Sequence, residues 1–150
     1  MATAIQEYWA EVGVQAEIQT AEWTQYRADR RAGKFACDLY GWQGDNGDPD
    51  NFLYTHFHSA NADPEIGLNV AFYKNPEIDK LLEQGQTSID ENVRRDAYYK
   101  AQEILLQDAP WVAIAYAKPP IGLQEEVKGF VPNPVSSEAF NSVDFAGGGQ

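Results

Sequence analysis

Two periods of apolar residues along the chain predict helices and strands in alternation. Apolar side chains recur at the spacing of one helix face near the start of the chain, at Ile5, Tyr8, Trp9 and Val12. Gly13 suits the left-handed position that ends such a helix, and residues 14–19 then alternate apolar with polar, as in a half-buried strand. A second helix is expected from a cap at Thr20 to about Arg31, followed by a second strand over 35–42.

Start signals predict three helices in the middle of the chain. Asp48-Pro49 and Asn75-Pro76 each combine an N-cap side chain with a proline at the first helical position. Asp90 starts a longer helix with one apolar stripe, which Pro110 ends. Residues 111–116 are apolar throughout and predict a strand buried on both faces. Because the apolar stripes need a surface to cover, we expect these helices to pack on a sheet, which gives an α/β fold.

Composition narrows the class of protein. The chain has 150 residues, 43% hydrophobic and 23% charged, which is typical of one folded domain, and no apolar run approaches the ~20 residues that span a bilayer. The formal net charge of −12 repels phosphate backbones, so we expect no nucleic-acid partner. Cys37 is the single cysteine, which excludes an intrachain disulfide, and we expect it to be buried in a strand.

The two ends of the chain differ from its middle. Residues 2–12 enter a helix at once, with neither a basic n-region nor an apolar h-region, so we expect no signal peptide in this chain and a start inside a helix. Lys118-Pro119-Pro120 ends the last apolar stretch, and the residues after it are extended and punctuated by proline. We therefore expect one unit over 1–117 and a second over 118–150, which ends in a flexible glycine-rich tail.

The loop over 43–51 holds the candidate chemistry because it is dense in glycine and aspartate. Asp45 follows the end of a predicted strand, where open α/β sheets hold ligands, and lies beside Trp42. A calcium loop of the EF-hand type is not expected, since the glutamate that should close it is missing. Asp45 with Asp48 or Glu65 could serve a hydrolase, although helix capping explains Asp48 without catalysis.

Two histidines raise the question of a metal site. His56 and His58 would share one face of an extended segment, but no third ligand follows at a suitable spacing, so we expect no metal. Neither a phosphate-binding glycine loop, nor a Gly-x-Ser-x-Gly motif, nor a dinucleotide-binding fingerprint occurs in the sequence. We therefore expect neither an enzyme nor a cofactor.

Residues 41–52, GWQGDNGDPDNF, resemble the signature segment of the dipeptide- and oligopeptide-binding proteins. These are the extracytoplasmic solute-binding receptors of ABC peptide importers, the bacterial extracellular solute-binding protein family 5. Further segments continue the similarity in the order of the family, at 4–14, 73–79, 94–99, 109–111 and 127–130. Members are several times longer, and this chain resembles their C-terminal part. The resemblance implies a two-lobed α/β fold of the periplasmic-binding-protein (type II-like) class, with this chain supplying mainly the C-terminal lobe.

The resemblance also implies a binding site. The aspartate that pairs with the α-ammonium group of the peptide falls on Asp45. The backbone of Gly41 to Gln43 would pair with the extended ligand, Trp42 would line the pocket for its side chain, and Gly44 belongs to the same ligand-binding set. The arginine that binds the peptide carboxylate would lie before the first residue of this chain.

Partners and location follow from the same resemblance. The implied partners are a dipeptide or short peptide, the membrane permease of the importer and the missing N-terminal lobe, and the implied location is periplasmic or otherwise extracytoplasmic. A second interpretation keeps the ancestry but not the transport, and describes a small free-standing α/β interaction domain. Exposed apolar surface where a missing lobe would pack would favour the receptor over this alternative.

Overall fold

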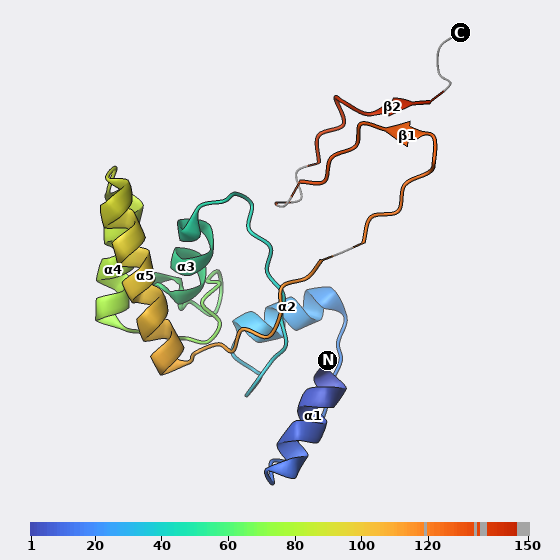
Figure 1. Cartoon of the computed structure of the whole chain (residues 1–150). Coiled ribbons are helices and arrows are strands. Elements are labelled where there is room, and N and C mark those ends of the chain that lie inside the picture. Colours follow the sequence, from blue (N-terminus) through green and yellow to red (C-terminus); the bar gives the residue numbers. More distant parts are fainter. Residues whose placement is uncertain (119, 134, 136–137, 147–150) are drawn as a thin grey trace.

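The computed structural model describes residues 1–118, 120–133, 135 and 138–146. Helices dominate these residues (Figure 1). The elements in chain order are α1 (Ala2–Glu11), α2 (Trp23–Arg31), α3 (Pro49–Phe57), the short 3-10 helix η1 (Ser59–Asn61), α4 (Pro76–Thr87), α5 (Glu91–Asp108), β1 (Val127–Lys128) and β2 (Asp144–Phe145). In Figure 1, α3, α4 and α5 lie together, whereas an extended segment leads from α5 to the β1–β2 hairpin.

The helix starts confirm most of the local signals. The carboxylate of Asp48 accepts a hydrogen bond from the backbone N–H of Asp50 at 2.9 Å, and the amide oxygen of Asn75 accepts one from Glu77 at 2.9 Å. In both cases proline occupies the first turn, as predicted. The cap of α2 was predicted wrongly, because Glu22 and not Thr20 accepts from the first N–H groups. A longer carboxylate side chain can reach the same donors as Ser, Thr or Asp, and it also favours the positive end of the helix dipole.

The cap of α5 gives a first test of these local contacts. The Asp90 carboxylate accepts from the backbone N–H of Asn92 at 2.8 Å and of Val93 at 3.3 Å. We expect Asp90→Ala to lower the free energy of unfolding by about 1 kcal/mol in urea titrations, because two N–H groups lose their acceptor. Glu103→Ala, an exposed change within the same helix, is the control and should shift stability by less than about 0.5 kcal/mol. Equal shifts for the two variants would contradict the cap.

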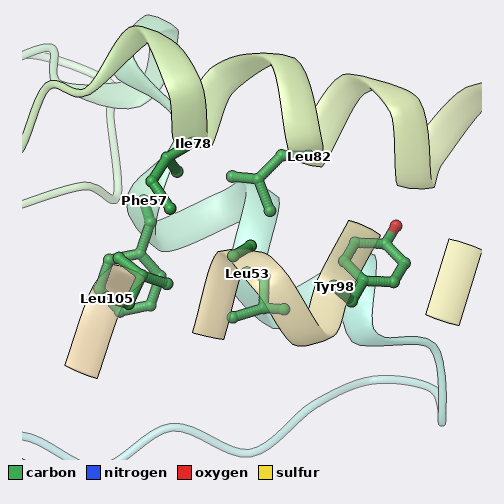
Figure 2. Packing of buried hydrophobic residues seen from close by; sticks show 7 residues of the cluster. Leu53, Phe57, Ile78, Leu82, Tyr98 and Leu105 are labelled. Atoms are coloured by element: carbon green, nitrogen blue, oxygen red, sulfur yellow. The ribbon is translucent and has the colours of Figure 1, made fainter. Parts of the chain in front are cut away.

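The core is formed by three helices and not by helices on a sheet. Buried side chains from α3, α4 and α5 meet in one cluster (Figure 2), made of Leu53, Phe57, Ile78, Leu82, Tyr98, Ala101 and Leu105. Gly85 allows α4 and α5 to approach closely, since an added Cβ would lie 2.6 Å from the Tyr98 ring. The expectation that the helices pack on a sheet is therefore wrong for the described residues, because the apolar stripes of α4 and α5 cover each other and α3.

The three predicted strands are not paired. Residues 14–19, 35–42 and 111–116 belong to no strand, and the ladder found in the described residues joins β1 and β2 antiparallel. A strand requires a neighbour that offers N–H and C=O groups, and the described chain supplies none for these segments. Apolar side chains along them are consequently exposed, among them Val14, Ile18, Leu39, Val112 and Ile114. Cys37 is exposed for the same reason, contrary to expectation.

The secondary structure of the chain changes after α5. The described residues beyond Asp108 hold no helix and consist of extended segments with one short hairpin, in which Val127 pairs with Phe145. The division into units at 117/118 stays a prediction. The end of the expected flexible tail, residues 147–150, lies outside the described residues. Among the helices that the structure describes, none combines the length and apolar composition needed to cross a membrane.

Candidate functional site

The candidate ligand segment, residues 41–45, lies in the connection between α2 and α3 and leads into a turn before α3. Burial alternates along it: Gly41, Gln43 and Asp45 are exposed, whereas Trp42 and Gly44 are half-buried. Alternation with a period of two is the property of an extended backbone that presents one face outward. The segment therefore offers Asp45 and main-chain groups on its outer side, while Trp42 extends toward the interior.

The turn after the extended segment is held by asparagine side chains. The backbone N–H of Asp45 donates to the Asn51 side-chain oxygen at 3.1 Å, and the N–H of Asp48 donates to that of Asn46 at 2.9 Å. The turn is tight around Gly44, because an added Cβ would lie 3.2 Å from the Asn46 carbonyl and 3.3 Å from the Asn51 side chain. Among the described residues, none donates to the Asp45 carboxylate. The turn thus fixes the backbone of Asp45 and leaves its charge open to a ligand.

Trp42 borders a small cavity of about 140 Å³. The cavity is lined by Arg27, Arg30, Arg31, Tyr40, Trp42, Leu68 and Val70. Arg30 is buried, forms an ion pair with Asp38 and places its guanidinium 3.7 Å from the centre of the Tyr40 ring. The sequence predicted a helix that ends near Arg31, but it did not indicate that Arg30 is buried beside the candidate segment. The contact depends on Asp38 and Tyr40, which approach Arg30 only in the folded chain.

The two histidines have different surroundings. His56 lies in the last turn of α3 and His58 directly follows it, so the expected extended segment is helical. His56 Nδ1 lies 3.1 Å from the Leu68 carbonyl, whereas His58 Nε2 lies 3.3 Å from Glu83. No group of three metal-ligating side chains occurs in the part of the chain that the structure describes. Each imidazole has its own hydrogen-bond partner on a different segment.

The protonation of His56 links stability to pH. Burial lowers the pKa of His56 from 6.5 to about 4, the charge of Arg30 acts in the same direction, and the hydrogen bond to Leu68 opposes the shift. As the pH falls, His56 therefore becomes protonated near pH 6.5 in the unfolded chain but only near pH 4 in the folded chain. Stability should fall by about 3 kcal/mol as the pH drops through this window. Urea unfolding at pH 7 and pH 4.5 measures the loss, which should be much smaller in His56→Gln; equal losses would contradict the buried neutral imidazole.

The other acidic side chains of the loop already have structural partners. The Asp48 carboxylate caps α3 and forms an ion pair with Arg94 at 2.5 Å. Asp50 accepts from the Gln86 amide at 3.2 Å and from the Tyr98 hydroxyl at 3.5 Å. These contacts give both aspartates a role in holding α3 against α4 and α5.

Comparisons with known proteins find relatives of this chain. Residues 1–64 match the model of the bacterial extracellular solute-binding proteins, family 5 Middle. The chain is 37% identical over 148 residues to the heme-binding protein A of Haemophilus influenzae and 37% identical over 143 residues to the dipeptide-binding protein of Escherichia coli. These alignments cover 98% and 95% of this chain but 26% of each relative. The chain thus spans about a quarter of the length of the curated relatives that it matches.

Solved structures extend the similarity to the fold. An ABC transporter-associated periplasmic binding protein from Helicobacter pylori, in complex with the peptide STSA, has a TM-score of 0.82 and 35% identity. A dipeptide-binding protein from Pseudoalteromonas, in complex with Met-Leu, has a TM-score of 0.76 and 26% identity. Each comparison covers 97% of this chain and 28% of the other. The fold is that of part of a type II-like periplasmic binding protein, and in sequence and in fold the chain is a relative of the bacterial extracellular solute-binding proteins, family 5.

Proposed function

We propose that this chain supplies part of the peptide site in the substrate-binding receptor of an ABC importer for dipeptides or oligopeptides. Asp45 pairs with the α-ammonium of the peptide, the backbone from Gly41 to Gln43 forms hydrogen bonds with the extended ligand, and Gly44 belongs to the same binding set. Trp42 lines the pocket for a ligand side chain. The observation that carries this proposal is the exposed carboxylate of Asp45 on a turn that Asn51 holds from the first helical turn of α3.

The chemistry of the ligand explains why such a segment suits it. A dipeptide is a zwitterion that a receptor can recognise by one anion, one cation and main-chain partners that ignore side-chain identity. Asp45 provides the anion, and the extended segment provides the main-chain groups. The cation for the carboxylate is an arginine outside this chain. The site in this chain alone is therefore half complete, and it binds weakly because no second lobe excludes water from the charges.

The same proposal assigns each part of this chain to a lobe of the receptor. Residues 1–117 contribute to the C-terminal lobe, and residues 118–150 return toward the first lobe. The exposed apolar side chains of the unpaired segments support this assignment, because strand-like segments such as 14–19 and 111–116 need neighbouring strands to cover them. The receptor works outside the cytoplasmic membrane, delivers peptide to a membrane permease and performs no chemistry on it. It needs no cofactor and binds no nucleic acid.

Blocking the ammonium group of the ligand tests the role of Asp45. Alanyl-alanine, added at high concentration to the ¹⁵N-labelled chain, should shift the backbone resonances of residues 41–45, and N-acetylated alanyl-alanine should shift them far less. The reason is that acetylation removes the positive charge that the carboxylate recognises. Asp45→Asn should lose the preference for the free amine, while Glu103→Gln, which removes an exposed carboxylate in α5, should keep it. Equal binding of both peptides by the unchanged chain would mean that Asp45 does not bind the peptide ammonium group.

The alternative function is a free-standing interaction domain that keeps the ancestry but not the transport. The same exposed apolar side chains would then meet a protein partner. This candidate would be favoured if free dipeptides shift no resonances in the experiment above and sedimentation shows that the chain self-associates.

A further inference from the structure

A buried imidazole lies where three distant parts of the chain meet. His56 on α3 has no solvent exposure, and three aromatic rings surround it. The ring centroid of Trp42 lies 4.5 Å away, that of Trp111 4.9 Å and that of Phe52 5.2 Å. Trp42 belongs to the candidate ligand segment and Trp111 to the segment after α5. His56 is therefore placed to influence the position of Trp42, a contact that nothing in the sequence pattern revealed.

The hydrogen bond to Leu68 fixes which nitrogen of His56 carries the proton. A carbonyl oxygen can only accept, so Nδ1, 3.1 Å from the Leu68 carbonyl, is the protonated nitrogen. Apolar surroundings favour the neutral ring, because a charged imidazole would lose its hydration. In a neutral ring with the proton on Nδ1, Nε2 is a bare acceptor. This atom is buried and has no hydrogen-bond partner among the described residues.

The indole of Trp42 supplies the complementary group. Its Nε1 is also buried without a partner, and within the described residues these two are the buried side-chain nitrogen or oxygen atoms that lack one. An indole N–H can only donate, whereas the free Nε2 of His56 can only accept. The two rings are neighbours in an edge-to-face arrangement, with an angle of 83° between their planes. One unsatisfied donor and one unsatisfied acceptor thus belong to adjacent rings.

We propose that one buried water molecule links Trp42 Nε1–H to His56 Nε2 and so fixes the orientation of the indole. The water accepts from the indole N–H and donates to the imidazole nitrogen, so each of the two buried nitrogens gains the partner that it lacks. The two nitrogens form no direct hydrogen bond in the structure. Resting on the proposed function, the link makes His56 a positioning residue: it holds the side chain that borders both the peptide segment and the cavity beside Tyr40.

Nuclear magnetic resonance of the complete 150-residue chain tests the link directly. The ¹⁵N shifts of the His56 ring should show a protonated Nδ1 and a bare Nε2 at pH 7. The Trp42 indole N–H, identified by its loss in Trp42→Phe, should show a cross-peak to a long-lived water. A proton on Nε2 would overturn the proposal, and so would an indole resonance without a water contact. The tautomer measurement uses the unchanged chain and does not depend on whether any variant folds.

A pair of substitutions separates positioning from mere packing. His56→Leu keeps an apolar side chain at the position but removes the acceptor, so the Trp42 indole proton should shift toward the value of an unbonded N–H. His56→Gln retains an acceptor oxygen and should restore most of the original shift. Peptide affinity should follow, with a loss of about fivefold in His56→Leu, the factor for one neutral hydrogen bond, and recovery in His56→Gln.

The two readouts distinguish failure of this link from failure of the proposed function. The expected tautomer and water contact in a chain that binds no peptide would overturn the proposed function and leave the link standing. Peptide binding that is equally strong in His56→Leu and the unchanged chain would overturn the positioning role of His56. An indole resonance that does not move in His56→Leu would overturn the link itself.

Discussion

Replacing Asp45 by alanine in the complete receptor is expected to weaken dipeptide binding by about 30- to 4,000-fold, which corresponds to about 2 to 5 kcal/mol. The reason is that closure around the peptide buries its ammonium group. Without the carboxylate, that charge is left desolvated and unpaired. Isothermal titration calorimetry with alanyl-alanine measures the change in dissociation constant.

Two further variants show whether the loss of dipeptide affinity is caused by removal of the negative charge. Asp45→Asn keeps the shape of the side chain and should weaken binding nearly as much as alanine does, since the amide carries no charge. Glu103→Ala removes an equally exposed carboxylate from α5 and should leave the dissociation constant unchanged. A dissociation constant that Asp45→Ala leaves unaltered would remove Asp45 from the site.

Truncating Leu82 is expected to lower the free energy of unfolding by about 2 to 5 kcal/mol. Leu82 is fully buried and points from α4 into the cluster that holds the three helices together (Figure 2). Leu82→Ala removes apolar atoms that no other side chain can replace and leaves a cavity. Because such a loss is a large fraction of the stability of a small domain, urea unfolding should show a clearly lower midpoint.

Leu106→Ala provides the matched control for this change. Leu106 lies on α5 with 82% of its surface exposed, so the same truncation removes little buried area and should alter stability by less than about 0.5 kcal/mol. Similar midpoints for the two variants would contradict a core centred on α3, α4 and α5.

The helices could be predicted because their signals are local. An N-cap side chain forms its hydrogen bonds within three residues, so Asp48, Asn75 and Asp90 marked helix starts that the structure confirms. Strand pairing depends on partners far away in the sequence, and apolar alternation over 14–19 reports an extended backbone without saying whether a neighbour exists. The pattern therefore predicted strands over three segments that form none in the described residues.

The outer side of the candidate site could be predicted from the sequence, whereas the inner side could not, again because its contacts are not local. Asp45 could be singled out from the sequence because glycine and aspartate cluster in one loop and the surrounding segment resembles a known family. The inner contacts could not, since they join residues far apart in the sequence: the His56 ring contacts Trp42, and Trp111 contacts both His56 and Arg30. A histidine two residues from another was open to interpretation as a metal ligand, and only burial among aromatic rings identified it as a neutral hydrogen-bonding group.

A crystal structure of the complete receptor with alanyl-alanine bound would test the central claim most directly. The account predicts the ammonium nitrogen of the peptide within about 3 Å of an Asp45 carboxylate oxygen, with the peptide backbone alongside residues 41–44. An ammonium group that pairs with another carboxylate, while Asp45 remains in contact with solvent, would contradict it.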